Sequence, residues 1–208
     1  MRRICFLDND IILKLVACNL FSEALRSLNL LESDLRVLSD AKYVFRNSRR
    51  ISRKYPLEIR ESAILIVERC QNIQPELSEE LRNLQIEGLD PGEMILISAT
   101  KQEESFYLTT GDKRCITVLA NSTEPGLLAI RERLAGKLVC LEQLILKIIS
   151  VEGFDITLNK ILPGREYDKA LKAIFGSGER CTQDNVLMAL QAYINNLRDN
   201  AQGLLADI

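Results

Sequence analysis

Residues 4–10, Ile-Cys-Phe-Leu-Asp-Asn-Asp, determine the fold class of this chain. The first four form a continuous apolar run of strand-forming side chains, which stops abruptly at Asp8. Such a run is typical of a strand that is buried on both faces, as in a parallel sheet. Residues 11–30 follow with apolar side chains at intervals of three and four, which is the spacing of a helix. The sequence therefore predicts a buried strand that leads directly into a helix.

A second apolar run, at residues 105–110, is also followed by an acid, Asp112. A short third strand is predicted at residues 137–140. The sequence between these strands is helical, and parallel neighbours require such crossovers. Further helices are predicted at 31–46, 57–72, 76–87, 91–100, 113–121, 125–134 and 141–150. The expected architecture belongs to the α/β class and is an α/β/α sandwich with a mostly parallel central sheet.

Glycine and proline interrupt the last part of the chain, which otherwise has the pattern of helices near 155–162, 165–175 and 182–204. We therefore expect a main domain at residues 1–150. The C-terminal helical extension, residues 151–208, is expected to pack on that domain.

The composition excludes several classes of function. The chain contains no histidine, so Ser-His-Asp and Cys-His nucleophiles, histidine-ligated zinc and a histidine pH switch are excluded. The 27 Lys and Arg residues nearly balance the 29 Asp and Glu residues, so only a local patch could attract nucleic acid. Any chemistry must depend on carboxylates, Lys or Arg, hydroxyls, thiols or a bound metal.

The six cysteines are widely spaced and form no CxxC pair, which indicates reduced thiols and a cytoplasmic location. The apolar stretch near the N-terminus is broken by acids after four residues. It is too short for a signal peptide or a membrane span. We therefore expect a soluble protein that makes no contact with a membrane.

Acids follow both long strands, because Asp8 ends the first and Asp112 the second. Ligands of open α/β sheets bind beyond the carboxyl ends of the strands, and Glu93, at the start of an apolar helix, is expected near the same rim. Three carboxylates that meet repel one another unless a cation lies among them. Oxygen-only ligands suit Mg²⁺ or Mn²⁺, so the sequence predicts a metal site.

Each of these acids also has a purely structural interpretation. Asp8 or Asp10 could cap the helix that follows the first strand. Glu93 fits a D-x-x-E capping box that begins at Asp90. Asp112 could be a turn residue. These roles do not explain why the acids fall at two strand ends and at the start of a buried helix.

Three segments resemble motifs of the PIN-domain nuclease family, in the family's order. They are FLDNDIILKL at residues 6–15, LDPGEMILISAT at residues 89–100 and SFYLTTGDKR at residues 105–114. The resemblance spans about residues 1–150 and implies a metal-dependent ribonuclease that cleaves single-stranded RNA, with Mg²⁺ or Mn²⁺ as cofactor. Some members are toxins of bacterial toxin–antitoxin pairs, so an antitoxin-like protein is an expected partner and a homodimer is a further candidate.

By this resemblance, the catalytic and metal-binding acids are Asp8, Glu93 and Asp112, and Thr110, the hydroxyl beside the last of them, is a substrate-binding residue. The family's fourth acid is missing after Asp112, and we expect Asp10 to replace it as a metal ligand, because it is two residues along from Asp8 in an extended chain. The missing acid also supports an alternative, a PIN-like module that binds RNA or protein without cleaving it.

A third alternative is a haloacid-dehalogenase-type phosphatase, because Asp8 and Asp10 also fit a nucleophile and its acid partner. Residues 137–160 lack the Asp-Asp or Gly-Asp pair that this family needs.

A basic cluster at residues 41–57 contains no acid and has aromatic residues interleaved with its cations. Guanidinium groups beside aromatic rings suit phosphate contacts and base stacking on single-stranded RNA. Arg49, Arg50 and Arg53 are therefore the predicted substrate-binding residues. The alternative is a solvated helix end whose aromatic side chains belong to the core.

Overall fold

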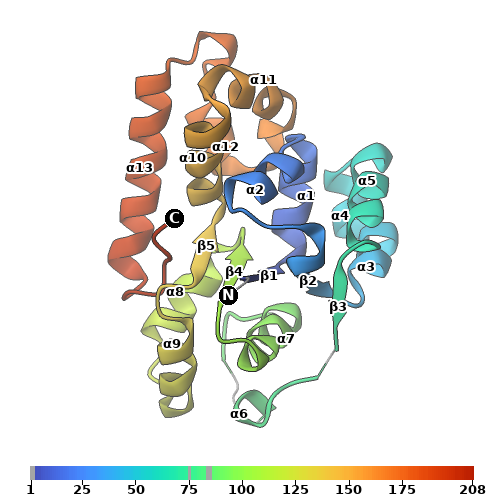
Figure 1. The fold of residues 1–208 in the computed structure, drawn as a ribbon, viewed down its shortest axis with the longest axis vertical. Helices are drawn as coiled ribbons and strands as arrows, with labels where there is room; N and C mark the ends of the chain where they lie inside the picture. Colours follow the sequence, from blue (N-terminus) through green and yellow to red (C-terminus); the bar gives the residue numbers. More distant parts are fainter. Residues whose placement is uncertain (1–2, 75, 83–85) are drawn as a thin grey trace.

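The computed structural model describes residues 3–74, 76–82 and 86–208. Its centre is a parallel sheet of five strands in the order β3-β2-β1-β4-β5 (Figure 1). The strands are β1 (Ile4–Leu7), β2 (Leu35–Leu38), β3 (Gln71–Ile73), β4 (Phe106–Thr110) and β5 (Leu138–Cys140). Every neighbouring pair is parallel. The α/β class and the parallel sheet predicted from the sequence are confirmed.

The strand order reverses between β1 and β4. From β1 the chain adds β2 and β3 on one side of the sheet, and it later adds β4 and β5 on the other. Leu7 pairs with Thr109, and the N–H of Asp8 donates to the Thr109 carbonyl at 3.1 Å. In open α/β sheets, the crevice at such a reversal, outside the carboxyl ends of the strands, is where ligands bind. Asp8 and Asp112 follow the two strands that form this reversal.

Helices flank the sheet, with α1, α2, α10 and α11 above the strands and α7 and α9 below them in the view of Figure 1. The α-helices are α1 (Asn9–Ala17), α2 (Phe21–Ser27), α3 (Ala41–Asn47), α4 (Arg49–Lys54), α5 (Leu57–Val67), α6 (Glu79–Arg82), α7 (Pro91–Ala99), α8 (Lys113–Asn121), α9 (Leu128–Leu134), α10 (Leu141–Glu152), α11 (Phe154–Gly164), α12 (Lys169–Ile174) and α13 (Gln183–Asn200). Short 3₁₀ turns lie at η1 (Glu32–Asp34), η2 (Thr100–Gln102), η3 (Pro125–Leu127), η4 (Arg165–Tyr167) and η5 (Gly178–Arg180).

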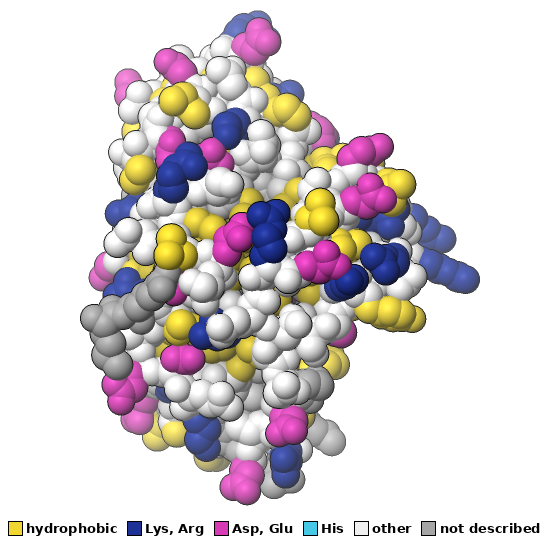
Figure 2. All heavy atoms as spheres, turned by 45° about the vertical axis from the view of Figure 1, so that its right-hand side comes forward, with side chains coloured by type: hydrophobic (Ala, Val, Ile, Leu, Met, Phe, Trp, Pro, Cys, Tyr) yellow, Lys and Arg dark blue, Asp and Glu magenta, His cyan; other side chains and the backbone are white. Residues whose placement is uncertain are grey.

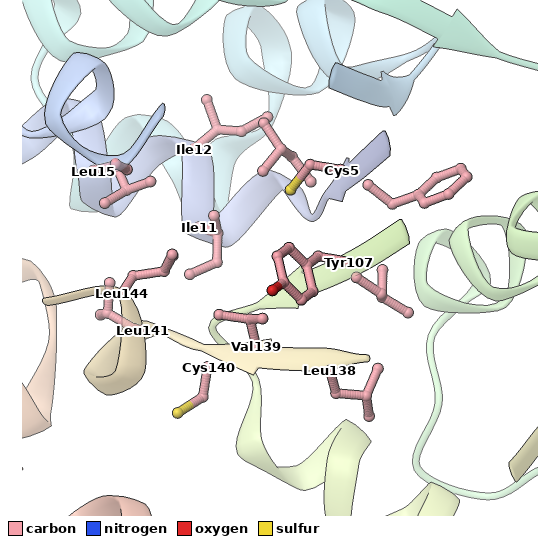
Figure 3. Close-up of a cluster of buried hydrophobic side chains, with 14 of the residues drawn as sticks. Cys5, Ile11, Ile12, Leu15, Tyr107, Leu138, Val139, Cys140, Leu141 and Leu144 are labelled. Atoms are coloured by element: carbon pink, nitrogen blue, oxygen red, sulfur yellow. The ribbon is translucent and has the colours of Figure 1, made fainter. Parts of the chain in front are cut away.

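The core on one face of the sheet is formed where α1 and α10 cover the strands. Figure 3 shows Ile11 and Leu15 of α1 in one cluster with Leu144 of α10, Tyr107 of β4 and Val139 of β5. All five side chains are buried. Burial of an aliphatic side chain of this size contributes about 1.5–3 kcal/mol, so the apolar positions of α1 fix that helix, and the residues at its start, against the sheet.

The predicted helix at 31–46 is wrong, because this segment contains η1, β2 and only the beginning of α3. The helix was predicted from the three- and four-residue spacing of Leu31, Leu35 and Leu38. Two of these leucines instead lie in β2, a strand of four residues. The predicted helix at 57–72 is too long for a similar reason, since α5 ends at Val67 and β3 begins at Gln71.

The predicted helix at 11–30 consists of two helices, α1 and α2. The break occurs at Asn19, whose φ of 50° lies in the left-handed region, where asparagine often ends a helix. Of the predicted helix at 76–87, α6 covers Glu79–Arg82, and residues 83–85 lie outside the described part.

The C-terminal helices pack on the rest of the chain, with α13 against α10 and α8 and with α11 against α1. Gly164 is in such close contact with the backbone of Ala17 and Cys18 that a Cβ atom would overlap them. The end of the chain lies along β5, where the Leu138 N–H donates to the Leu204 carbonyl at 2.9 Å and the Ala206 N–H donates to the Leu138 carbonyl at 2.8 Å.

The structure also bears on the cysteines and on the membrane-spanning potential of the helices. All six cysteines are free thiols, as the sequence predicted. Among the helices in the described residues, none combines the length and the apolar character needed to cross a membrane.

Candidate functional site

A pocket of about 870 Å³ opens at the carboxyl ends of β1 and β4. Four predicted site acids line it together: Asp8, Asp10, Glu93 and Asp112. Arg50 and Lys54 of α4 form part of another wall, with Tyr55 beside them. Residues 166–170 of the C-terminal extension, from η4 to the first turn of α12, also line it. The pocket therefore brings acids from three separate segments to the point where the strand order reverses.

Asp8 is the N-cap residue of α1, but its side chain makes no capping hydrogen bond. The Thr110 hydroxyl donates to Asp8 Oδ2 at 3.4 Å. Burial, and then the neighbouring carboxylates of Asp10 and Glu93, raise the pKa of Asp8 to about 7. Asp8 is thus a largely buried carboxylate that lacks a cationic partner among the described residues and lies close to like charges.

Glu93 has the capping role that the sequence offered as an alternative. Its Oε2 accepts from the Asp90 N–H at 2.8 Å, and Asp90 Oδ1 accepts from the Glu93 N–H at 2.9 Å. Burial is the main reason that the pKa of Glu93 is raised to about 7, and the charges of Asp90 and Asp112 act in the same direction. The Cys115 thiol also interacts with this carboxylate. Glu93 therefore both caps α7 and lines the pocket.

Asp112 is the N-cap residue of α8. One carboxylate oxygen accepts from the Arg114 N–H at 2.8 Å, and the other accepts from the Arg114 guanidinium at 3.1 Å. The Asp112 N–H donates to the Thr110 hydroxyl at 3.0 Å. Thr110 therefore links the acids that follow β1 and β4, as expected for a hydroxyl beside the second of them.

Asp10 does not have the backbone that we expected for it. Helix α1 begins at Asn9, so Asp10 lies in the first turn of a helix and not in an extended chain. It reaches the same pocket but forms an ion pair, with Asp10 Oδ2 at 2.5 Å from Lys14 Nζ. Its carboxylate is therefore already neutralised by a side chain of the same helix.

Sequence reasoning missed Lys14 and Asp168. Lys14 Nζ lies 2.7 Å from Asp168 Oδ2, and the Lys14 side chain is only 7% exposed. Burial alone would lower the pKa of Lys14, but the two carboxylates outweigh it and raise the pKa. A single lysine in the apolar run Ile11–Val16 was a sequence signal for a buried charge that needs partners. No signal pointed to a residue as distant as Asp168.

The basic cluster lies on α3 and α4, beside the pocket. Figure 2 shows Lys and Arg side chains gathered at the right-hand edge of the molecule, where Figure 1 has α3 to α5. Arg50 lines the pocket, and Arg49 and Arg53 are exposed on the same helix, outside the lining.

The aromatic residues of this cluster divide between core and surface. Phe45 and Tyr55 belong to the core, with exposed fractions of 0% and 2%, whereas Tyr43 is 69% exposed. The Tyr55 ring stacks on the Tyr167 ring of η4, with centroids 4.9 Å apart. Tyr43 is therefore the aromatic side chain of the three that is free to stack on a base.

The acids fit a divalent metal ion by their chemistry. All four carry carboxylate oxygens, which are the donors that Mg²⁺ and Mn²⁺ prefer. Within the described ranges, no three acidic or thiol side chains are placed so that they could hold an ion together. Mg²⁺ commonly needs only one or two carboxylates, with water and substrate phosphates as its other ligands. Asp8 and one neighbouring acid would supply that number of carboxylates.

Comparison of the chain with protein-family models, with curated proteins and with solved structures finds no match. The pocket and the surface beside it are therefore the features of this chain that bear on its function.

Proposed function

We propose that this protein is a Mg²⁺- or Mn²⁺-dependent ribonuclease that hydrolyses phosphodiester bonds of single-stranded RNA. The observation that carries the proposal is the convergence of Asp8, Asp10, Glu93 and Asp112 on one pocket at the strand-order reversal, with Arg50 on its wall. Carboxylates that hold a cation and an arginine that contacts phosphate are two kinds of group suited to metal-dependent phosphodiester hydrolysis.

The metal would bind at Asp8, with Glu93 or Asp112 as the second carboxylate. Asp8 is the best candidate, because among the described residues its carboxylate has no cationic partner and its side-chain hydrogen bond, from the Thr110 hydroxyl, is long at 3.4 Å. A bound divalent cation would activate water and neutralise charge on the phosphate. The chain's own part is to hold Asp8 and Asp112 just beyond the ends of β1 and β4, and Glu93 in the first turn of α7, so that little reorganisation accompanies binding.

The RNA would reach the pocket over α3 and α4. Arg49, Arg50 and Arg53 present guanidinium groups along one short helix, and exposed Tyr43 on α3 offers a ring for stacking. Single-stranded nucleic acid is bound by this combination of cations and aromatic rings. Arg50 is the cation through which this surface joins the pocket.

Cleavage of a labelled single-stranded RNA in Mn²⁺ and in Mg²⁺, with enzyme in excess, tests the proposal. Asp8→Asn should abolish cleavage, because the nearly isosteric amide cannot supply the charge that holds the metal. Asp40→Asn is the matched control: Asp40 lines the same pocket but is exposed and follows β2. That variant should keep at least half of the wild-type rate. Equal rates in wild type and Asp8→Asn would refute the proposal.

A second candidate is an RNA-binding module without cleavage. It is favoured by the partners that three of the acids already have: Lys14 for Asp10, the Asp90 N–H for Glu93 and Arg114 for Asp112. If wild type cuts neither RNA nor single-stranded DNA and still binds RNA through the arginines of α4, this second function is correct.

A further inference from the structure

We propose that the Lys14 ammonium is a built-in counter-ion of this site. It neutralises Asp10, so that the site takes a single divalent cation, at Asp8, and Asp168 of the C-terminal segment is the positioning residue that holds the ammonium in place. The inference rests on the proposed metal-dependent function and adds to it the number of metal ions and the role of the C-terminal segment.

The surroundings of Lys14 Nζ match the needs of an ammonium group. It has three N–H donors, and three oxygens surround it: Asp10 Oδ2 at 2.5 Å, Asp168 Oδ2 at 2.7 Å and the Gly111 carbonyl at 3.4 Å. The side chain is only 7% exposed, so water has little access to the group. An ammonium with these partners is fixed in position.

The chain leaves room for the ammonium at Gly111. A Cβ atom at this position would overlap Asp10 Oδ2 and come within 2.9 Å of Lys14 Nζ. The loop between β4 and α8, which carries Asp112, therefore approaches Lys14 as closely as it does because it has a glycine here.

The two carboxylate oxygens of Asp168 have different partners. Oδ1 accepts from the N–H groups of Ala170 and Leu171 at 2.8 and 3.0 Å and so caps α12, whereas Oδ2 contacts Lys14. Because α12 fixes the carboxylate, Asp168 holds the ammonium even if Asp10 moves. Next to it in the chain, Tyr167 stacks on Tyr55, which fastens the same segment to the wall of the pocket.

This arrangement determines how many cations the acids can accept. A second divalent ion beside Asp10 would have to lie against the fixed positive charge of Lys14, whose side chain is only 7% exposed, and like charges at such short range repel each other. Within the part of the chain that the structure describes, no such cation contacts Asp8, so it is the carboxylate left to bind a metal. The site therefore combines one exchangeable cation with one that is part of the chain.

Mn²⁺ titration of the full chain, followed by electron paramagnetic resonance, measures both the number of ions and their dissociation constant. Wild type should bind one Mn²⁺. Lys14→Gln removes the charge and should lower the Kd for Mn²⁺ at least tenfold, and Lys14→Arg, which keeps the charge, should restore the wild-type value within threefold. A folded Lys14→Gln protein with an unchanged or higher Kd would overturn the inference, as would two equivalent ions in wild type.

A second pair of variants keeps the test decisive if Lys14→Gln does not fold. Asp168→Asn retains the cap of α12, since asparagine is an equally good N-cap, but leaves Lys14 paired with Asp10 alone and should raise the Kd at least threefold. Glu166→Gln is the control with the same change of charge in the same segment, because Glu166 contacts Lys172 and Arg165 instead. It should change the Kd less than twofold. Equal effects of the two variants would overturn the inference.

The RNA cleavage assay, run on the same samples, separates the two proposals. If Mn²⁺ affinity responds to Lys14 as expected but wild type cuts no RNA, the nuclease proposal fails and the counter-ion inference stands. If wild type cuts RNA but substitution of Lys14 leaves the Kd for Mn²⁺ unchanged, the counter-ion inference fails and the nuclease proposal stands. If no Mn²⁺ binds to wild type at millimolar concentration, both are overturned.

Discussion

Asp90 and Glu93 each accept a hydrogen bond from the other's backbone N–H, at 2.9 and 2.8 Å. The same Glu93 carboxylate lines the pocket with Asp8, so it has a structural and a proposed chemical role that mutation can separate. Glu93→Gln should keep the cap, because glutamine also completes a capping box, while Mn²⁺ binding weakens. Glu93→Ala should lose the cap as well and lower the free energy of unfolding by about 1 kcal/mol.

Thermal melts of both variants in EDTA, and again with added Mn²⁺, measure the two roles. In EDTA at pH 4, where the raised pKa of Glu93 keeps its carboxyl protonated in the folded chain, we expect Glu93→Gln to melt close to wild type and Glu93→Ala to melt lower. If the Mn²⁺-induced rise in Tm is the same for wild type and Glu93→Gln, Glu93 takes no part in metal binding.

The raised pKa of Asp8 predicts a dependence of stability on pH. The folded-state pKa is about 7, against an ordinary value of 3.8, so the folded chain holds this proton more tightly than the unfolded chain. The resulting stabilisation is complete below about pH 4 and is lost as the pH rises through 7. Asp8→Asn removes the penalty and should be more stable than wild type at pH 8 in EDTA, by about 1–3 kcal/mol.

Urea unfolding of wild type and Asp8→Asn between pH 4.5 and 8 tests whether the variant is the more stable protein at high pH. The difference in unfolding free energy should shrink steadily as the pH falls below 7. A difference that is constant across the range would show that Asp8 ionises normally.

Neutralising Arg49, Arg50 and Arg53 together should weaken the binding of single-stranded RNA and flatten its dependence on salt. Fewer counter-ions are released when fewer cations contact phosphates, and each lost contact reduces the slope of log K against log salt by about 0.7 for single strands. Fluorescence anisotropy at several salt concentrations gives this slope.

The control for the arginine variant is a triple change of Arg82, Lys101 and Arg180 to glutamine, which removes the same charge from exposed positions outside α3 and α4. If both triple variants weaken RNA binding equally, net charge alone explains binding and the α4 surface is not the RNA-binding site.

The stack between Tyr55 and Tyr167 is expected to stabilise the C-terminal wall of the pocket. Tyr167→Ala should lower the free energy of unfolding by about 1–2 kcal/mol, since an aromatic pair contributes about 0.5–1.5 kcal/mol beyond the area that it buries. Tyr167→Phe keeps the ring and should melt within about one degree of wild type. Differential scanning calorimetry of the three proteins compares them, and equal melting of Ala and Phe variants would contradict a stabilising stack.

The parts of the fold that could be predicted from the sequence are those where a local pattern determines the structure. β1 and β4 were found because a continuous apolar run that ends at an acid has few other interpretations. β2 and β3 were missed, because strands of four and three residues are too short to show a periodicity of their own. Leu31, Leu35 and Leu38 even have helical spacing by coincidence.

The site could be predicted to the extent that it follows from strand ends. Asp8 and Asp112 line one pocket because parallel strands place their carboxyl ends at the same edge. The pairing of Lys14 with Asp168 could not be foreseen, since it depends on how α11 and η4 pack against α1. That packing is set by side-chain shape and by a close backbone contact at Gly164. Neither of these produces a periodic pattern in the sequence.

The hydrogen bonds of Leu204 and Ala206 to Leu138 protect the edge strand β5 from pairing with another copy of the chain. A strand at the border of a sheet exposes N–H and C=O groups that can recruit a strand from another chain. At β5 the chain's own tail occupies these groups. A protein shortened by these last residues would expose that border and would be expected to self-associate before it unfolds.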